Sequence, residues 1–182
     1  IGVFAAIYLV EYSKRGNRFV KIIRVTAETL SGIPSIVYGL FGYIVFVITL
    51  GWSFTLLSGV ITMAIMILPL IMRTTEEALM AVPDSFREGS FGLGAGRLRT
   101  VFRIVLPSSI PGILSGVILA IGRIVGESAA LIFTSGTNPV VPKSLFSSAS
   151  TLSVHLYTLL NEGRYTDQAY ATAVVLLIVV II

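Results

Sequence analysis

The sequence predicts an all-helical membrane protein with about five spanning helices. Of its 182 residues, 55% are apolar and only 12% are charged, and the mean hydropathy is +0.94. Soluble domains hold about 25% charged residues, so the composition argues against a soluble protein. Several apolar runs approach the roughly 20 residues that cross a membrane as a helix, which makes a soluble helical bundle a poor alternative.

Both ends of the chain lie in apolar segments. The run from Ile1 to Val10 is too short to cross a membrane by itself, so we interpret it as the end of a first helix. The run from Ala169 to Ile182 is the beginning of a last one. We therefore expect residues 1–182 to form a single transmembrane domain that is truncated at both ends.

The second apolar segment, from about Ala27 to Leu50, is interrupted by Gly32-Ile33-Pro34. Proline removes a backbone donor and kinks a helix. Inside a membrane such a break is tolerated only against protein or a water-filled path. We predict a kinked span in which Gly32 and Pro34 form either a gating hinge or only a packing kink. The next span is expected from Phe54 to Met72.

Lysine and arginine concentrate in two segments, residues 11–24 and residues 73–106. The residues are Lys14, Arg15, Arg18, Lys21 and Arg24 in the first, and Arg73, Arg87, Arg97, Arg99 and Arg103 in the second. Two spans separate the segments, so both lie on one side of the membrane, and the positive-inside rule assigns that side to the cytoplasm. A loop of about residues 135–168, rich in Ser, Gly and Pro, is then extracytoplasmic.

The second basic loop, about residues 73–107, has the pattern of a short helix followed by a glycine stop. Ser85 and Glu88 fit a capping box, in which Ser85 is the N-cap and Glu88 reaches back to its amide. The helix would extend to Leu93 and end at Gly94, which accepts the left-handed conformation at low cost. A second short helix is expected, with apolar and basic faces formed by Leu98, Val101, Phe102 and Val105 and by Arg97, Arg99 and Arg103. An ordinary amphipathic connector on the membrane surface would look similar.

The span from Pro111 to Thr134 carries two charged residues. Arg123 and Glu127 are four residues apart and therefore share a helical face. A charge at the centre of a membrane helix costs about 2.5–3.5 kcal/mol, so such residues face the bundle interior or a water-filled path. Either the two form a self-neutralising packing pair, or Arg123 helps an anion through while Glu127 holds its side chain. Arg73, at the cytoplasmic mouth of its span, is either a positive-inside anchor or part of the exit path.

Other kinds of site are excluded by what the sequence lacks. It has no cysteine and a single histidine, His155, so we expect no metal site. No Gly-x-x-x-x-Gly-Lys-Ser/Thr sequence occurs, so we reject nucleotide binding. The net charge of +4 arises mainly from the loops beside the membrane, which predicts contact with lipid and no nucleic-acid partner.

The spacing within the second basic loop resembles a known element. Glu88-Gly89-Ser90 is followed by Gly94 and then by Ile104 and Leu106-Pro107. This layout resembles the EAA loop of permease subunits of prokaryotic ABC importers, which contacts the ATPase. Gly89 and Ser90 stand where the family usually has two alanines, and both are small enough for close packing. The resemblance implies an ATPase-docking set of Ser85, Arg87, Glu88, Gly89, Ser90, Gly94, Leu106 and Pro107.

Three further segments, residues 32–42, 73–78 and 126–129, resemble the phosphate importer permeases, and the PstA type more than the PstC type. The resemblance implies the type I ABC importer transmembrane fold, which is MetI-like. It also implies a PstC-type permease partner, an ABC ATPase dimer and an extracytoplasmic phosphate-binding protein. In such an assembly, in a prokaryotic plasma membrane, the ATPase binds ATP, so this subunit would have no cofactor and no enzymatic activity.

Three alternatives stay open. A permease for another oxyanion, such as sulfate or molybdate, would carry the same loop, because the loop faces the ATPase and not the substrate. An ATP-independent secondary transporter would also contain a broken helix like that expected at Gly32 and Pro34. A membrane scaffold or assembly subunit would tolerate the loss of Arg123 and Glu127.

Overall fold

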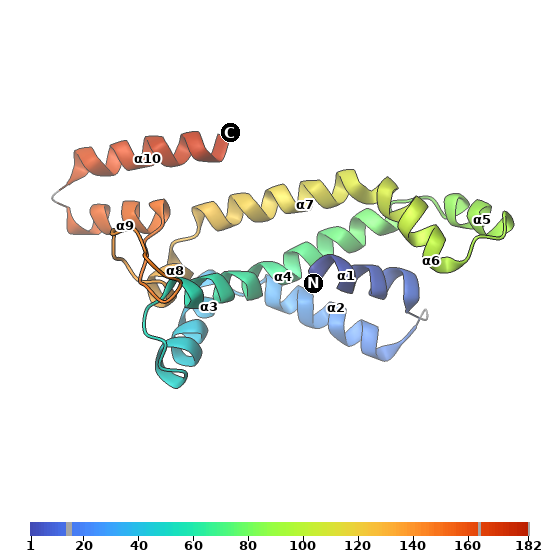
Figure 1. Ribbon diagram of the computed structural model, residues 1–182, viewed down its shortest axis with the longest axis horizontal. Coiled ribbons are helices and arrows are strands. Elements are labelled where there is room, and N and C mark those ends of the chain that lie inside the picture. Colours follow the sequence, from blue (N-terminus) through green and yellow to red (C-terminus); the bar gives the residue numbers. More distant parts are fainter. Residues whose placement is uncertain (14–15, 164, 182) are drawn as a thin grey trace. The chain divides into compact units, whose positions relative to one another are not determined.

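The computed structural model describes residues 1–13, 16–163 and 165–181, and every regular element in these ranges is a helix (Figure 1). The predicted all-helical class is therefore confirmed. Three short stretches, labelled η, are π-helical, with i→i+5 hydrogen bonds in place of i→i+4. The elements are α1 (Gly2–Ile7), η1 (Tyr8–Tyr12), α2 (Arg18–Ser31), α3 (Ser35–Gly42), η2 (Tyr43–Thr49), α4 (Leu56–Met80), α5 (Asp84–Gly92), α6 (Arg97–Thr100), η3 (Val101–Val105), α7 (Leu106–Gly126), α8 (Ala129–Thr134), α9 (Leu152–Glu162) and α10 (Thr166–Ile181).

Contacts within the chain divide it into two compact units. The first unit comprises Ile1–Gly32 and Ile67–Ala120, and the second comprises Ile33–Met66 and Ile121–Ile182. The long helices α4 and α7 contribute residues to both. One boundary between the units lies between Gly32 and Ile33, within the predicted hinge segment Gly32-Ile33-Pro34.

The core of the first unit joins α1 and η1 to the end of α4 and to η3. Its buried apolar residues are Ala6, Ile7, Leu9, Val20, Met72, Leu79, Val82, Val101 and Val105. Glycines bring α7 close to α4 in this unit. A Cβ atom added to Gly112 would lie 2.7 Å from that of Ala78, and one added to Gly116 would clash with the side chain of Thr74. Small residues allow such close helix packing, so a larger side chain at either glycine would separate the two helices.

In the second unit, α3 packs directly on α8. A Cβ atom added to Gly39 would lie 2.8 Å from the Cα atom of Ala130 and 3.2 Å from the carbonyl oxygen of Ala129. Two of the segments with the phosphate-permease resemblance, residues 32–42 and 126–129, therefore meet in this unit. Close backbone packing explains why residue 39, in the first of these segments, is a glycine.

Backbone carbonyl groups close the N-terminus of α4 within the second unit. A helix N-terminus has unpaired N–H groups that can bind an anion if nothing else accepts from them. Here three consecutive N–H groups donate to the loop around α8, in the pairs Thr55 to Thr134, Leu56 to Ser147 and Leu57 to Leu145, at 2.9–3.1 Å. These bonds satisfy the helix end, so it offers few donors to a ligand.

Among the described residues, two helices are long and apolar enough to cross a membrane, Leu56–Met80 and the continuous helix Arg97–Gly126. The pair Arg18–Ser31 and Ser35–Thr49 passes the same test together, with a 99° bend between its members. Two shorter apolar helices, Gly2–Tyr12 and Thr166–Ile181, lie at the ends of the chain. These five segments correspond to the predicted spans, the first and last being too short to cross alone.

The predicted kink at Gly32 and Pro34 is a full break. Helix α2 ends at Ser31, and Pro34 precedes the first residue of α3 with ψ of 140°, outside the helical range. Proline lacks the N–H that would continue the helix, and it pushes the preceding residue out of the helical region. The consequence is two separate helices in place of a kinked but continuous span.

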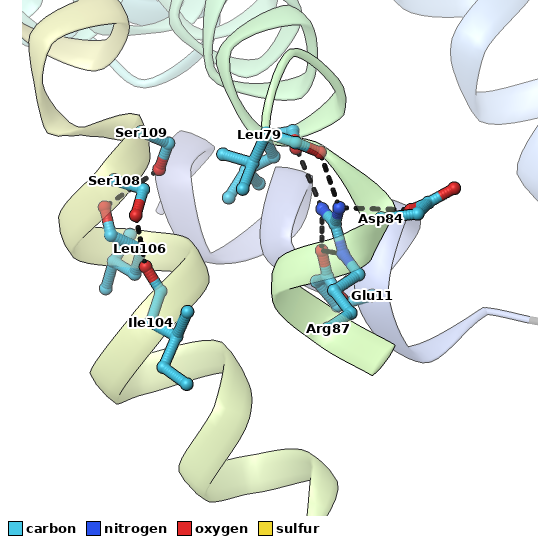
Figure 2. A network of polar contacts seen from close by, with 9 residues as sticks. Glu11, Leu79, Asp84, Arg87, Ile104, Leu106, Ser108 and Ser109 are labelled. Carbon is cyan, nitrogen blue, oxygen red and sulfur yellow. Dashed lines mark hydrogen bonds and ion pairs between the residues drawn. The ribbon is translucent and has the colours of Figure 1, made fainter. Parts of the chain in front are cut away.

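The second short helix expected in the basic loop does not end at Leu106-Pro107. The helix runs from Arg97 through both Pro107 and Pro111 to Gly126. The π-helical stretch η3 ends at Val105, two residues before Pro107, and the hydroxyl of Ser108 donates to the carbonyl of Ile104 at 2.8 Å (Figure 2). A local π bulge and side-chain donors satisfy the backbone near a proline, so the helix can continue.

Three predicted segments differ from the helices of the structure. The span expected from Pro111 to Thr134 is interrupted at residues 127–128, between α7 and α8. Much of the segment 11–24, expected as a loop, is helical, because Asn17 caps α2 by accepting from the N–H of Phe19 at 3.0 Å. Lys14 and Arg15 of that segment lie outside the described residues. The outer loop 135–168 contains α9, which Thr151 caps and which ends at Gly163 in the left-handed conformation.

Candidate functional site

Helix α5 is the short helix predicted in the second basic loop, but its start differs. It begins at Asp84 after Pro83, and no side chain of the described residues caps it. Ser85 lies within the first turn, so the predicted capping box of Ser85 and Glu88 is wrong. Pro83 has φ of −56° and ψ of 139°, which places the chain outside the helix until Asp84. The proline thus supplies the helix start that we assigned to the serine.

The predicted glycine stop after α5 is confirmed. The helix ends at Gly92, and Gly94 has φ of +81°, which only glycine adopts without strain. The N–H of Gly94 donates to the carbonyl of Phe91 at 2.9 Å, and that of Ala95 donates to Ser90 at 3.1 Å. A Cβ atom on Gly94 would meet no described atom within 4 Å. The glycine is therefore required by the backbone conformation and not by lack of space.

Arg87 of α5 is the centre of a polar network in the first unit (Figure 2). Its Nε and Nη2 atoms donate to one carboxylate oxygen of Glu11, at 3.1 and 2.7 Å. Nη2 also donates to the carbonyl of Leu79 at 2.9 Å, and Nη1 donates to that of Val82 at 2.7 Å and to Asp84 at 3.2 Å. The side chain of Arg87 is only 15% exposed. Arg87, which we predicted to dock the ATPase, therefore faces its own chain.

Sequence reasoning missed Glu11. Its side chain is 8% exposed and lies in η1, at the end of the first apolar helix. The sequence did contain a signal, because Glu11 is an acidic residue at the end of an apolar run. If such a carboxylate is buried, it needs a partner. The identity of that partner, 76 residues further along the chain, was not visible in the sequence.

The predicted docking residues separate into inward and outward groups. Ser90 is buried, and its hydroxyl shares a hydrogen bond of 2.8 Å with that of Thr100, which ties α5 to α6. Glu88 and Gly89 are exposed. Leu106 packs against the core of the first unit, whereas Pro107 is exposed on α7.

A groove of about 650 Å³ runs along α5 and brings four of the predicted residues together. Arg99 and Arg103 lie beside them and give the groove two positive charges. Its lining includes Ser85, Gly89, Ser90 and Gly94, and excludes Leu106 and Pro107. The lining of the groove therefore combines small residues, large apolar residues such as Leu93, and two cationic side chains.

Large apolar side chains around this groove are exposed. The most exposed is Leu93 at 92%, and the others are Phe86, Phe91, Leu98 and Phe102. The predicted apolar face of the second short helix is divided, because Val101 and Val105 are buried while Leu98 and Phe102 are not. An exposed group of large apolar residues beside charged ones is typical of a protein-binding surface.

Arg73, predicted at the cytoplasmic mouth of a span, is held by two carboxylates in the first unit. It lies 3.2 Å from Glu77 on α4 and 3.5 Å from Glu28 on α2. Nearby, Arg24 of α2 pairs with the nearly buried Glu76 of α4 at 2.9 Å. These ion pairs join α2 to α4. Two carboxylates on one guanidinium leave no net positive charge at Arg73, which disfavours an anion there.

The predicted ion pair between Arg123 and Glu127 is wrong, since none joins these residues in the part of the chain that the structure describes. Helix α7 ends at Gly126, so the two are not on one continuous helical face. Glu127 is 9% exposed, and its carboxylate accepts from the N–H of Ala130 at 3.1 Å, at the start of α8. Arg123 is half-buried and lies within electrostatic reach of Tyr38 on α3, in the same unit. The structure therefore gives Arg123 a different neighbour and makes Glu127 a helix cap.

The chain matches proteins of known families over its whole length. A family profile described as the inner membrane component of binding-protein-dependent transport systems matches residues 1–182. The phosphate transport system permease protein PstA of Yersinia pestis is 38% identical, with 98% of this chain and 60% of the relative covered. PstA 1 of Mycobacterium tuberculosis is 34% identical, with 99% and 59% covered. The probable ABC transporter permease protein YqgI of Bacillus subtilis is 38% identical, with 92% and 61% covered.

The chain thus spans about 60% of the length of these curated relatives. A solved structure of the MetNI methionine ABC transporter, in an inward-facing conformation, contains a chain of the same fold. The TM-score is 0.77 at 19% sequence identity, with 99% of this chain and 79% of that chain covered. The predicted MetI-like fold is confirmed by this similarity.

Proposed function

Since the chain belongs to the family of binding-protein-dependent transport system inner membrane components, we propose that it is the permease subunit of an ATP-driven phosphate importer. The choice of phosphate is supported by relatives at 34–38% identity that are phosphate transport permeases of the PstA type. We propose that the complete protein lies in the prokaryotic plasma membrane and forms half of a translocation path. A PstC-type permease would supply the other half.

The observation that carries this proposal is the outward side of α5. It combines the exposed Glu88 and Gly89, the groove with Arg99 and Arg103, and large apolar side chains that include Leu93. We assign this surface to an ABC ATPase dimer, which would bind and hydrolyse ATP. Arg87, Ser90 and Leu106 then support the surface from inside. This subunit would itself need no cofactor and catalyse no reaction.

We assign the anion path to the second unit, around Arg123. A guanidinium presents two parallel donors to an oxyanion such as phosphate. Its position near Tyr38 on α3 leaves it without a described carboxylate partner, so its charge stays available to an anion. Arg73, which two carboxylates hold, fits an anchor at the cytoplasmic end better than a transport residue. An extracytoplasmic phosphate-binding protein would deliver the anion.

We propose that Gly32 and Pro34 act as a hinge. A hinge consists of a few residues that absorb a change of backbone direction. The break between α2 and α3 supplies such residues, and a boundary between the two compact units falls there. The same break is the one observation that favours the ATP-independent secondary transporter, because discontinuous helices are common in that class.

The test is uptake of labelled phosphate by cells that lack their own importer. The cells would express the full-length protein together with its neighbouring subunits, with an ATPase-deficient partner as the control and excess sulfate as the competitor. Uptake that requires the active ATPase and ignores sulfate is the expected result. Uptake without the ATPase would establish the secondary transporter, and uptake that sulfate blocks would establish a permease for another oxyanion.

A further inference from the structure

We infer that the buried pair of Glu11 and Arg87 is a mechanical link, through which the end of the first apolar helix follows the ATPase-docking helix α5. This inference rests on the proposed function. Glu11 and Arg87 would be positioning residues, since neither meets the substrate or the outer face of α5. Glu11 lies on an element that has no part in the docking surface.

The guanidinium of Arg87 joins three elements at one point (Figure 2). All three of its nitrogen atoms donate: to Glu11 in η1, to the carbonyls of Leu79 in the last turn of α4 and of Val82 just after that helix, and to Asp84 at the start of α5 itself. An arginine has five N–H donors in a rigid planar fork. The fork therefore fixes the orientation of α5 relative to both η1 and the end of α4.

Arg87 contacts the C-terminal end of α4, where a positive charge is favoured. The last carbonyl groups of a helix have no partner within the helix, and they form the negative end of its dipole. Leu79 lies in the last turn of α4 and Val82 in the turn that follows Met80, and Arg87 donates to their carbonyls at 2.9 and 2.7 Å. A force that moved α5 would act on α4 through these bonds and on η1 through Glu11.

The burial of the pair argues for a geometric role. Glu11 is 8% exposed and Arg87 is 15% exposed. A buried ion pair contributes little more to stability than apolar residues of the same size would, but removing one partner leaves an uncompensated charge. Two donors on a single oxygen of Glu11 also restrict the direction of the contact. Such a pair holds one geometry, and the close-packed interior around it transmits displacement.

The test compares two carboxylates that contact the same guanidinium. Glu11→Gln removes the buried charge, and Asp84→Asn removes the charge of a residue that is 70% exposed. The full-length protein would be reconstituted with its partner subunits in liposomes, and phosphate uptake and ATP hydrolysis would be measured on the same preparation. For Glu11→Gln, we expect uptake per ATP hydrolysed to fall about tenfold or more while hydrolysis continues. The glutamine keeps an acceptor oxygen but leaves the charge of Arg87 uncompensated, which costs more than about a decade in an equilibrium constant. For Asp84→Asn the ratio should stay at the wild-type value.

The ratio separates coupling from stability. A residue needed only for folding would lower uptake and hydrolysis together and leave their ratio unchanged, which would overturn the inference. Glu11→Asp keeps the charge but withdraws it by one methylene, so we expect an intermediate ratio. If neither Glu11 variant assembled with its partners, the pair would serve folding and the inference would also fail. If the wild-type complex showed no ATP-driven phosphate uptake, the proposed function would fail instead.

Discussion

A substitution at Gly39 tests whether α3 and α8 meet through their backbones. In Gly39→Ala the new Cβ atom would lie 2.8 Å from the Cα atom of Ala130 and 3.2 Å from two carbonyl oxygens of α8. Real Cβ atoms essentially never show a contact under 3.0 Å. The obstacle is backbone, which cannot rotate away as a side chain could. The two helices would have to separate, and the second unit would lose part of its packing.

The magnitude follows from two opposing terms. Overpacking costs about 1–3 kcal/mol, and the backbone obstacle places Gly39→Ala near the upper end of that range. The same change gains about 1 kcal/mol of helix propensity. We therefore expect the variant to be about 2 kcal/mol less stable than the wild type. Gly122→Ala is the matched control, because its Cβ atom would meet no described atom within 4 Å.

The assay is unfolding of the purified chain in detergent micelles by titration with sodium dodecyl sulfate, followed by circular dichroism. Both variants carry the same propensity gain, so the difference between them isolates the steric cost at Gly39. We expect that difference to be about 3 kcal/mol. Equal stability of the two variants would refute the backbone contact between α3 and α8.

Three further predictions concern single residues. Arg123→Gln should abolish phosphate uptake without loss of folding, measured by labelled uptake and by the yield of monodisperse protein; full uptake would remove Arg123 from the anion path. Glu127→Ala should destabilise the protein by about 1 kcal/mol through loss of the cap on α8. Glu127→Gln keeps an acceptor for the N–H of Ala130 and should cost less. A denaturation assay would measure both changes in stability. Gly94→Ala should lower the stability by about 1–2 kcal/mol because of its positive φ, while Gly89→Ala should stabilise α5 by about 0.5–1 kcal/mol. If a denaturation assay found the Gly94 variant more stable than the Gly89 variant, the helix end at Gly92 would be contradicted.

The division of the docking loop into inward and outward residues has a consequence for mutagenesis. Substitution of Arg87 or Ser90 would disturb the attachment of α5 to its own chain, through Glu11 and Thr100 respectively. Substitution of the exposed Glu88 would act on the partner surface alone. A loss of ATPase binding in an Arg87 variant would therefore be an indirect effect, and only the exposed positions report on the interface directly.

The features that depend on composition and on local backbone conformation could be predicted from the amino-acid sequence. A low charge content and long apolar runs predict membrane helices, because the hydrocarbon core excludes charge and unpaired backbone groups. Gly94 predicts the end of α5, because a left-handed residue strongly favours glycine regardless of its surroundings. The spacing from Glu88 to Pro107 resembles the EAA loop of ABC importer permeases, and the docking role that it implies stays a prediction.

Which distant groups meet could not be predicted without the three-dimensional fold. The pairing of Glu11 with Arg87 joins residues 76 positions apart, and the contact of Gly39 with Ala130 joins two different helices. Arg123 and Glu127 have the spacing of a helical pair, yet the helix ends between them and Glu127 caps the next helix instead. Sequence spacing predicts contacts only while one regular element continues. Where elements break and pack, burial and unsatisfied backbone groups choose the partner.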